Sequence, residues 1–79
     1  MFYVYILESL EYPNKHYTGF TKDLKKRIEK HNNGEVTHTT KYKPWKIITY
    51  LAFEQESKAR EFERYLKTHS GRSFSQKHF

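Results

Sequence analysis

Five side chains that could take part in chemistry stand in or beside the apolar patterns of this sequence: Tyr5, Tyr17, Arg27, His31 and Glu63. A phenol can accept a proton when nearby cations lower its pKa below the usual value of about 10. A guanidinium suits a phosphate group, and an imidazole can relay a proton near neutral pH. These residue types together indicate chemistry on a phosphate.

Glu63 is the clearest polar residue in an apolar place. It falls four residues after Ala59 and three before Leu66, so it lies at the buried edge of a predicted helix. An unpaired carboxylate there would be costly, and a metal or a cation would remove that cost. The alternative is a structural one, in which Glu63 reaches water or pairs with Lys67, four residues later.

Arg27 and His31 are four residues apart, so both project from one side of a helix, where they could meet the same phosphate oxygen. Taken alone, they could also be an exposed arginine and a helix-terminal histidine favoured by the helix dipole. Tyr5 and Tyr17, taken singly, could simply pack on a sheet. Gly19 interrupts a strand pattern, which indicates a bulge or a close approach to the backbone.

The elements that must position these residues form an α+β fold. We expect a strand from Phe2 to Glu8 that is buried on both faces, a turn at Pro13 and Asn14, and a second strand from His16 to Phe20. A helix capped by Thr21 or Asp23 follows and ends at Asn32, Asn33 and Gly34.

The second half adds a third strand from Trp45 to Phe53 and a helix capped by Ser57 that fades near Ser70. We expect the tail, Arg72 to Phe79, to be anchored by Phe74 and Phe79. The order is strand, strand, helix, strand, helix. The prediction is therefore one domain over residues 1–79, with a three-stranded antiparallel sheet flanked by helices.

Positive charge is confined to two blocks of the chain. Lys22 to Lys46 carries eight basic and three acidic residues, and Arg64 to Phe79 carries four basic and no acidic ones, within a net charge of +6. If the fold joins these blocks, they form a surface for a polyanion; otherwise they are solvated charge. The chain has no cysteine, which excludes disulfides and thiolate sites, and its apolar runs are too short to span a membrane. We expect a cytoplasmic protein without a membrane partner or a small-molecule cofactor.

With these residues placed, the sequence resembles the small single-domain members of the GIY-YIG nuclease superfamily along essentially its whole length. The first motif stands as Tyr3-Val4-Tyr5 and the second as Tyr17-Thr18-Gly19. The arginine of the first helix, the histidine one turn later and the glutamate of the later helix match Arg27, His31 and Glu63. The chain departs from the pattern in having Tyr3 where the first motif opens with glycine, and in having no asparagine after Glu63.

The resemblance implies a single divalent metal, Mg²⁺ or Mn²⁺, held by Glu63. It also implies that Tyr5 or Tyr17 helps to deprotonate a water molecule, that His31 can act as a relay, and that Arg27 stabilises charge on the scissile phosphate. The expected function is a metal-dependent endonuclease acting on nucleic acid, with DNA favoured, in repair or recombination.

The alternative is a nucleic-acid-binding module of the same fold with weak or no catalysis. In both cases we expect phosphate contacts from five lysines, and a partner protein is one source of specificity for so small a domain. The lysines are Lys25, Lys26, Lys30, Lys41 and Lys43.

Overall fold

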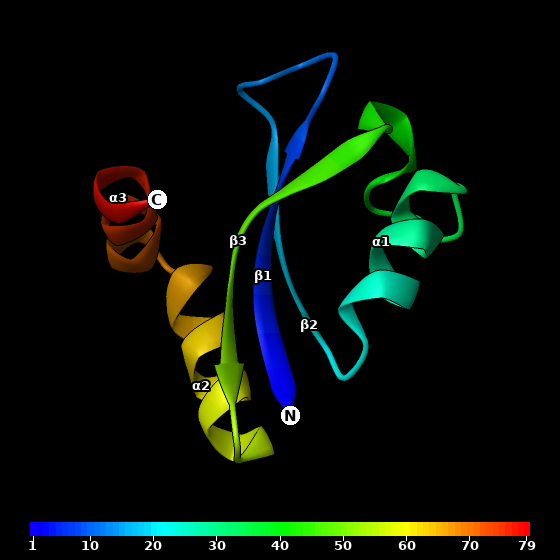
Figure 1. The fold of residues 1–79 in the computed structure, drawn as a ribbon. Helices are drawn as coiled ribbons and strands as arrows, with labels where there is room; N and C mark the ends of the chain where they lie inside the picture. The colour runs from blue at the N-terminus through cyan, green and yellow to red at the C-terminus, as the bar shows by residue number, and fades with distance from the viewer.

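A three-stranded antiparallel sheet lies at the centre of the fold, with helices on both faces (Figure 1). The computed structural model describes residues 1–79, apart from the side chain of His69. The sheet has the order β2-β1-β3, so the first strand is central. The elements are β1 (Phe2–Ser9), β2 (His16–Thr21), α1 (Leu24–Asn32), the short 3₁₀ helix η1 (Thr40–Tyr42), β3 (Trp45–Phe53), α2 (Glu56–Leu66) and α3 (His69–His78). The predicted fold class and element order are confirmed, with one further helix at the end.

The central strand β1 is buried on both faces, as its unbroken apolar sequence predicts. Val4 and Ile6 pack with Ala59 and Leu66 of α2. Tyr5 and its neighbours on the opposite face form a second cluster against α1 and the start of β3. Two thin cores, one on each side of the sheet, therefore hold the helices.

The ends of α1 are set by local hydrogen bonds. The Asp23 carboxylate accepts a bond from the backbone N–H of Lys26 at 3.1 Å, which caps the helix. At the other end Gly34 adopts a φ of 77°, a conformation that glycine takes without strain. Both boundaries agree with the prediction, and they fix which turn of α1 carries Arg27 and His31.

The second half differs from the prediction at two points. Helix α2 begins at Glu56 after Gln55, so Ser57 lies inside the helix and is not its cap. The tail forms a third helix, because Thr68 caps a new turn by accepting a bond from the Gly71 N–H at 3.1 Å. Gly71 is buried against the end of α2, where an added Cβ would overlap the Tyr65 carbonyl.

Aromatic contacts hold α3 in place. Phe74 packs against the cluster on the α2 face of the sheet, which agrees with its predicted role as an anchor. Phe79 lies with its ring centroid 5.8 Å from that of Phe74, although its side chain stays partly exposed. The low helix propensity of the tail is thus offset by a cap and by aromatic packing.

The helices of the two basic blocks lie on different sides of the sheet, although Lys67 of the second block reaches Tyr17. Helix α1, in the first block, lies on one side of the sheet, and α3, in the second, lies on the other (Figure 1). Phosphate contacts from α1 and from α3 would therefore come from different sides of the molecule. No helix in the described part of the chain is long and apolar enough to cross a membrane.

Candidate functional site

A chain of buried hydrogen bonds links the central strand to α1 and to the loop after it. The Tyr5 hydroxyl lies 2.8 Å from Nε2 of His31, and Nδ1 of His31 lies 2.7 Å from the Thr39 hydroxyl. All three side chains are at most 1% exposed. Residues from β1, α1 and the segment before η1 thus meet in one water-poor cluster.

The direction of these hydrogen bonds follows from the last acceptor in the series, which is the Val36 carbonyl. The Thr39 hydroxyl donates to the Val36 carbonyl at 3.3 Å, and a carbonyl can only accept. Thr39 therefore accepts from the Nδ1–H of His31, which leaves Nε2 of His31 as an acceptor for the Tyr5 hydroxyl. With this tautomer, the Tyr5 hydroxyl donates its hydrogen bond to His31.

His31 is held in its neutral form. Burial lowers the pKa of His31 from 6.5 to about 4, and the positive charge of Arg27 is the second cause of this shift. At neutral pH the imidazole therefore carries no charge, and its Nε2 accepts a hydrogen bond from the Tyr5 hydroxyl. His31 does lie in the last turn of α1, as the structural alternative has it, but its side chain has no exposed surface and its hydrogen bonds go to Tyr5 and Thr39.

The same pKa shift predicts an acid-sensitive fold. Because the folded pKa of His31 lies below its unfolded value, the unfolded chain takes up a proton first as the pH falls. The free energy of unfolding should fall by roughly 3 kcal/mol at most as the pH drops from about 6.5 to about 4. Denaturant unfolding across this range measures the loss, and His31→Gln, which cannot titrate, should lose less. A profile equally steep in both proteins would contradict it.

Tyr5 is buried over Gly19 of the neighbouring strand. The two residues pair across β1 and β2, and a Cβ on Gly19 would overlap the Tyr5 hydroxyl and ring. The close approach predicted at Gly19 therefore comes from this phenol. Burial raises the pKa of Tyr5, although the hydrogen bond and charge of Arg27 oppose the rise. Tyr5 thus keeps its proton at neutral pH.

Arg27 connects the buried cluster to the outside. Its Nε–H donates to the Tyr5 hydroxyl at 3.3 Å, and its side chain is partly exposed. The Tyr5 hydrogen bond raises the pKa of Arg27 against the opposing effect of burial, and Tyr17 also contributes to the rise. The guanidinium is thus fixed between two phenols, with part of its surface open to a phosphate.

Tyr17 is the more open of the two tyrosines. Its ring centroid lies 6.5 Å from that of Tyr5 and 5.2 Å from that of His31. It is partly exposed, whereas Tyr5 is 1% exposed. Of the two phenols, Tyr17 is therefore the one that a water molecule or a phosphate can reach in this conformation.

Glu63 stands beside this cluster on α2, with a side chain that is 18% exposed. Its negative charge is close enough to contribute to the raised pKa of Tyr5. Its Oε2 accepts a bond from Lys67 Nζ at 3.1 Å, which is the pairing that the structural alternative describes. The Lys67 ammonium also lies 5.6 Å from the centre of the Tyr17 ring. A cation therefore already stands at the carboxylate that we expect to hold a metal.

The donor set around Glu63 suits only one kind of metal. Among the described side chains, no group of three or more His, Cys, Asp or Glu residues could hold an ion, so a zinc-type cage is absent there. Mg²⁺, in contrast, keeps several waters and binds through one or two carboxylates plus substrate phosphates. A single carboxylate near the Tyr5 phenol fits that mode.

The five predicted lysines are all exposed. Lys25, Lys26 and Lys30 lie on α1, while Lys41 and Lys43 lie in and after η1, next to α1 (Figure 1). The Lys41 ammonium lies 5.5 Å from the centre of the Tyr42 ring. These lysines form a positive border on the α1 side of the sheet, which we call the α1 border.

Two site residues were not among the predicted ones. Thr39 lies in a polar, threonine-rich stretch, where no periodicity separates it from its neighbours. Its position is fixed by the indole of Trp45, whose Nε1–H donates to the Thr39 carbonyl at 2.8 Å. The spacing of Lys67 predicts only a pairing with Glu63. Its contact with Tyr17 depends on how α2 packs on the sheet.

Comparison with known proteins places the chain in a family. Residues 1–77 match the family described as the GIY-YIG catalytic domain. A UPF0213 protein of Streptococcus pyogenes serotype M3 is 36% identical over 72 residues, which cover 90% of this chain and 76% of that protein. A UPF0213 protein of Staphylococcus saprophyticus is 38% identical over 69 residues, covering 86% and 82% of the two chains.

A solved structure is also similar. The solution NMR structure of the UPF0213 protein BH0048 from Bacillus halodurans superposes with a TM-score of 0.57 at 35% identity. The match covers 96% of this chain and 81% of the other. The similarity in fold therefore extends over nearly the whole chain.

Proposed function

The chain belongs to the family of GIY-YIG catalytic domains, and from this premise we propose that it is a metal-dependent endonuclease that hydrolyses phosphodiester bonds of nucleic acid. The family's domain has a nuclease-type fold, and its members generally use divalent metals. DNA is the substrate that we favour. We place the activity in repair or recombination in the cytoplasm, with a partner protein supplying specificity.

One observation carries this proposal. The Arg27 guanidinium is held by Tyr5 at 3.3 Å and is close to Tyr17, and the Glu63 carboxylate is near enough to Tyr5 for its charge to raise the pKa of that phenol. A phosphate at this point would meet a fixed cation, a reachable phenol and a carboxylate. Such preorganised charge is what stabilises the transition state of phosphodiester cleavage.

In the proposed mechanism the buried residues position the exposed ones. Tyr5 keeps its proton and uses it to donate a hydrogen bond to His31, so the Tyr5 oxygen can accept the Arg27 N–H and fix the guanidinium. Arg27 binds a phosphate oxygen and stabilises the charge that builds on it. Tyr17, beside the same guanidinium, orients the attacking water and takes up its proton while releasing the phenol proton to solvent.

Glu63 would hold the divalent metal, together with waters and the phosphate itself. When bound, the metal supplies positive charge that lowers the cost of the developing charge on the phosphate and the leaving oxygen. Because Lys67 pairs with Glu63, the ion must compete with that ammonium. The affinity for the ion should therefore be modest when nucleic acid is absent.

A cleavage panel tests the proposal. The purified chain is incubated with single-stranded, duplex, nicked and branched forms of DNA and RNA, with Mg²⁺, with Mn²⁺ or with a chelator. Cleavage of at least one form that depends on the metal supports an endonuclease. Intact substrates in every lane would overturn it.

A second candidate function is favoured by the Lys67 contact. If the ammonium stays at Glu63 when nucleic acid binds, the chain is a binding module that holds phosphate through Arg27 and the α1 border. Binding would then be steeply weakened by salt and indifferent to the metal. Equal affinity with Mg²⁺ and with chelator, together with no cleavage, would identify this function.

A further inference from the structure

A pocket of about 550 Å³ lies on the sheet face opposite the Tyr5 cluster. It is bounded by α3, by the end of α2 and by the sheet, where Ile6 and Thr18 pair across β1 and β2. This volume is within the range of small-molecule sites, roughly 300–1,000 Å³. Of the residues that line the pocket, the mechanism above uses only Lys67.

The lining combines an apolar floor with basic and amide groups. Ile6, Ile48 and Leu66 supply apolar surface, and Phe79 supplies an aromatic ring. Asn14 and Gln76 contribute amides. No aspartate or glutamate is among the described residues that line it, so the pocket suits a flat, partly apolar group that carries an anion.

Arg72 is the cation best placed to meet that anion. The ammonium of Lys67 bonds to Glu63, and that of Lys15 lies 5.3 Å from the centre of the Tyr42 ring, so these two lysines line the pocket with their stems. Within the described residues, Arg72 makes no ion pair at 4.0 Å or less. Its guanidinium is therefore available for a phosphate.

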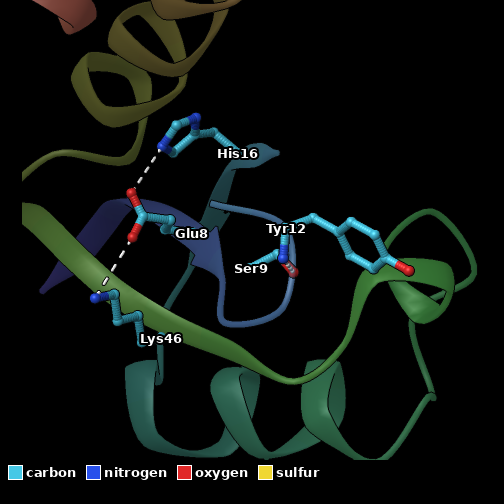
Figure 2. A network of polar contacts seen from close by, with 5 residues as sticks. All are labelled: Glu8, Ser9, Tyr12, His16 and Lys46. Atoms are coloured by element: carbon cyan, nitrogen blue, oxygen red, sulfur yellow. Dashed lines mark hydrogen bonds and ion pairs between the residues drawn. The ribbon is translucent and has the colours of Figure 1, made fainter. Parts of the chain in front are cut away.

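The carboxylate next to the pocket is already neutralised. Glu8 neighbours the pocket residue His16 across the β1 and β2 pairing, and its Oε2 lies 3.2 Å from His16 Nε2. Its Oε1 lies 3.4 Å from Lys46 Nζ, so the carboxylate is held between two basic side chains (Figure 2). Its negative charge therefore does not oppose an anion in the pocket.

The pocket and the Tyr17 site share a boundary. Strand β2 lies at the edge of the sheet, and neighbouring side chains on it point to opposite faces, so Thr18 lines the pocket while Tyr17 faces the candidate site. Lys67 reaches both, since its stem lines the pocket and its ammonium contacts Tyr17. A strand bound at the site needs only to cross the edge of β2 to enter the pocket.

We propose that this pocket binds one nucleotide of the nucleic-acid strand, with the base against the floor of Ile48, Leu66 and Phe79 and a phosphate on Arg72. The proposal rests on the proposed function, because a nuclease substrate is what would cross the edge of β2. The pocket then gives this small domain a contact with a base. Cleavage would then depend on whether the base of a nucleotide next to the scissile bond can unstack from its neighbours.

The test uses the intact ¹⁵N-labelled protein without metal, titrated with deoxyadenosine 5′-monophosphate, with deoxyadenosine and with inorganic phosphate. We expect the monophosphate to shift the backbone amides of Thr18, Ser75 and Gln76, and to bind more tightly than either fragment. Arg72→Gln should weaken it about tenfold, the effect of losing one charge-assisted hydrogen bond. Arg64→Gln, an exposed arginine outside this pocket, is the matched control and should bind as the wild type does.

Several outcomes would overturn the proposal that this pocket binds a nucleotide. These are shifts confined to the amides of Arg27 and His31, equal affinity for phosphate alone, and unchanged affinity in both Arg72→Gln and a second variant, Gln76→Ala. The titration needs no catalysis, so pocket shifts without cleavage would support the pocket while the nuclease fails. Where cleavage is found, Arg72→Gln should raise KM and leave kcat unchanged.

Discussion

Replacing Tyr17 by phenylalanine should lower the rate of metal-dependent cleavage by roughly 10²–10⁴-fold, the usual effect of removing a general base. The Tyr17 phenol is the partly exposed one beside Arg27, so it is the group that an attacking water can reach. Phenylalanine keeps the ring that packs near His31. Single-turnover cleavage with enzyme in excess measures the rate, and the thermal midpoint should hardly change.

Tyr5→Phe is the matched comparison for Tyr17→Phe. The Tyr5 hydroxyl is buried and bonded to His31 and Arg27, so its loss should cost about 1–3 kcal/mol of unfolding free energy. Cleavage should fall less than in Tyr17→Phe, because Arg27 loses a contact but keeps its charge. If Tyr5→Phe abolished cleavage while Tyr17→Phe cleaved normally, the roles assigned to the two phenols would be wrong.

Arg27→Lys should lower the single-turnover rate by roughly 10²–10³-fold, similar to removing one preorganised donor from a transition-state site. Lysine keeps the charge but lacks the planar fork, so it cannot hold the Tyr5 hydroxyl and a phosphate oxygen at the same time. Nucleic-acid affinity should change much less, since the α1 border is intact.

The control for Arg27→Lys is the same exchange at Arg60. That arginine is exposed on α2 and pairs with Glu56 at 2.9 Å, away from the phenols. Arg60→Lys should cleave at the wild-type rate. A rate for Arg27→Lys within a few-fold of that control would contradict the role of the guanidinium fork.

Local patterns of the sequence predict most of the fold. The uninterrupted apolar run of β1 predicts a strand buried on both faces, and Asp23 with Gly34 fixes the ends of α1. The spacing of Arg27 and His31 places them on one side of α1, and both do reach Tyr5. The periodicity of a short element therefore identifies residues that share a face.

Features that depend on packing between distant elements could not be predicted in this way. Helix α3 has no apolar periodicity, and its start depends on the Thr68 cap and on space at Gly71. The burial of Thr39 depends on Trp45. The separation of the two basic blocks depends on the opposite faces taken by α1 and α3 (Figure 1). Local patterns alone predict neither the start of α3 nor the burial of Thr39, and they leave open whether the two basic blocks meet.

Glu63 shows most clearly that spacing predicts the burial of a side chain but not its role. Its spacing predicts a half-buried carboxylate, and its side chain is 18% exposed. The spacing of Glu63 is consistent with two roles for its carboxylate, as a metal ligand and as the partner of Lys67. The ion pair with Lys67 is compatible with either, because an ammonium can be displaced by a metal with its phosphate.

The most direct test of the account compares metal-dependent cleavage by the wild type, Glu63→Gln and Glu61→Gln on one substrate form. Glutamine keeps the shape of the side chain and removes its charge, and Glu61 is an exposed glutamate on the same helix. The account predicts that the wild type and Glu61→Gln cleave only with Mg²⁺ or Mn²⁺, and that Glu63→Gln does not cleave. Equal cleavage by Glu63→Gln, or cleavage by the wild type in chelator, would contradict it.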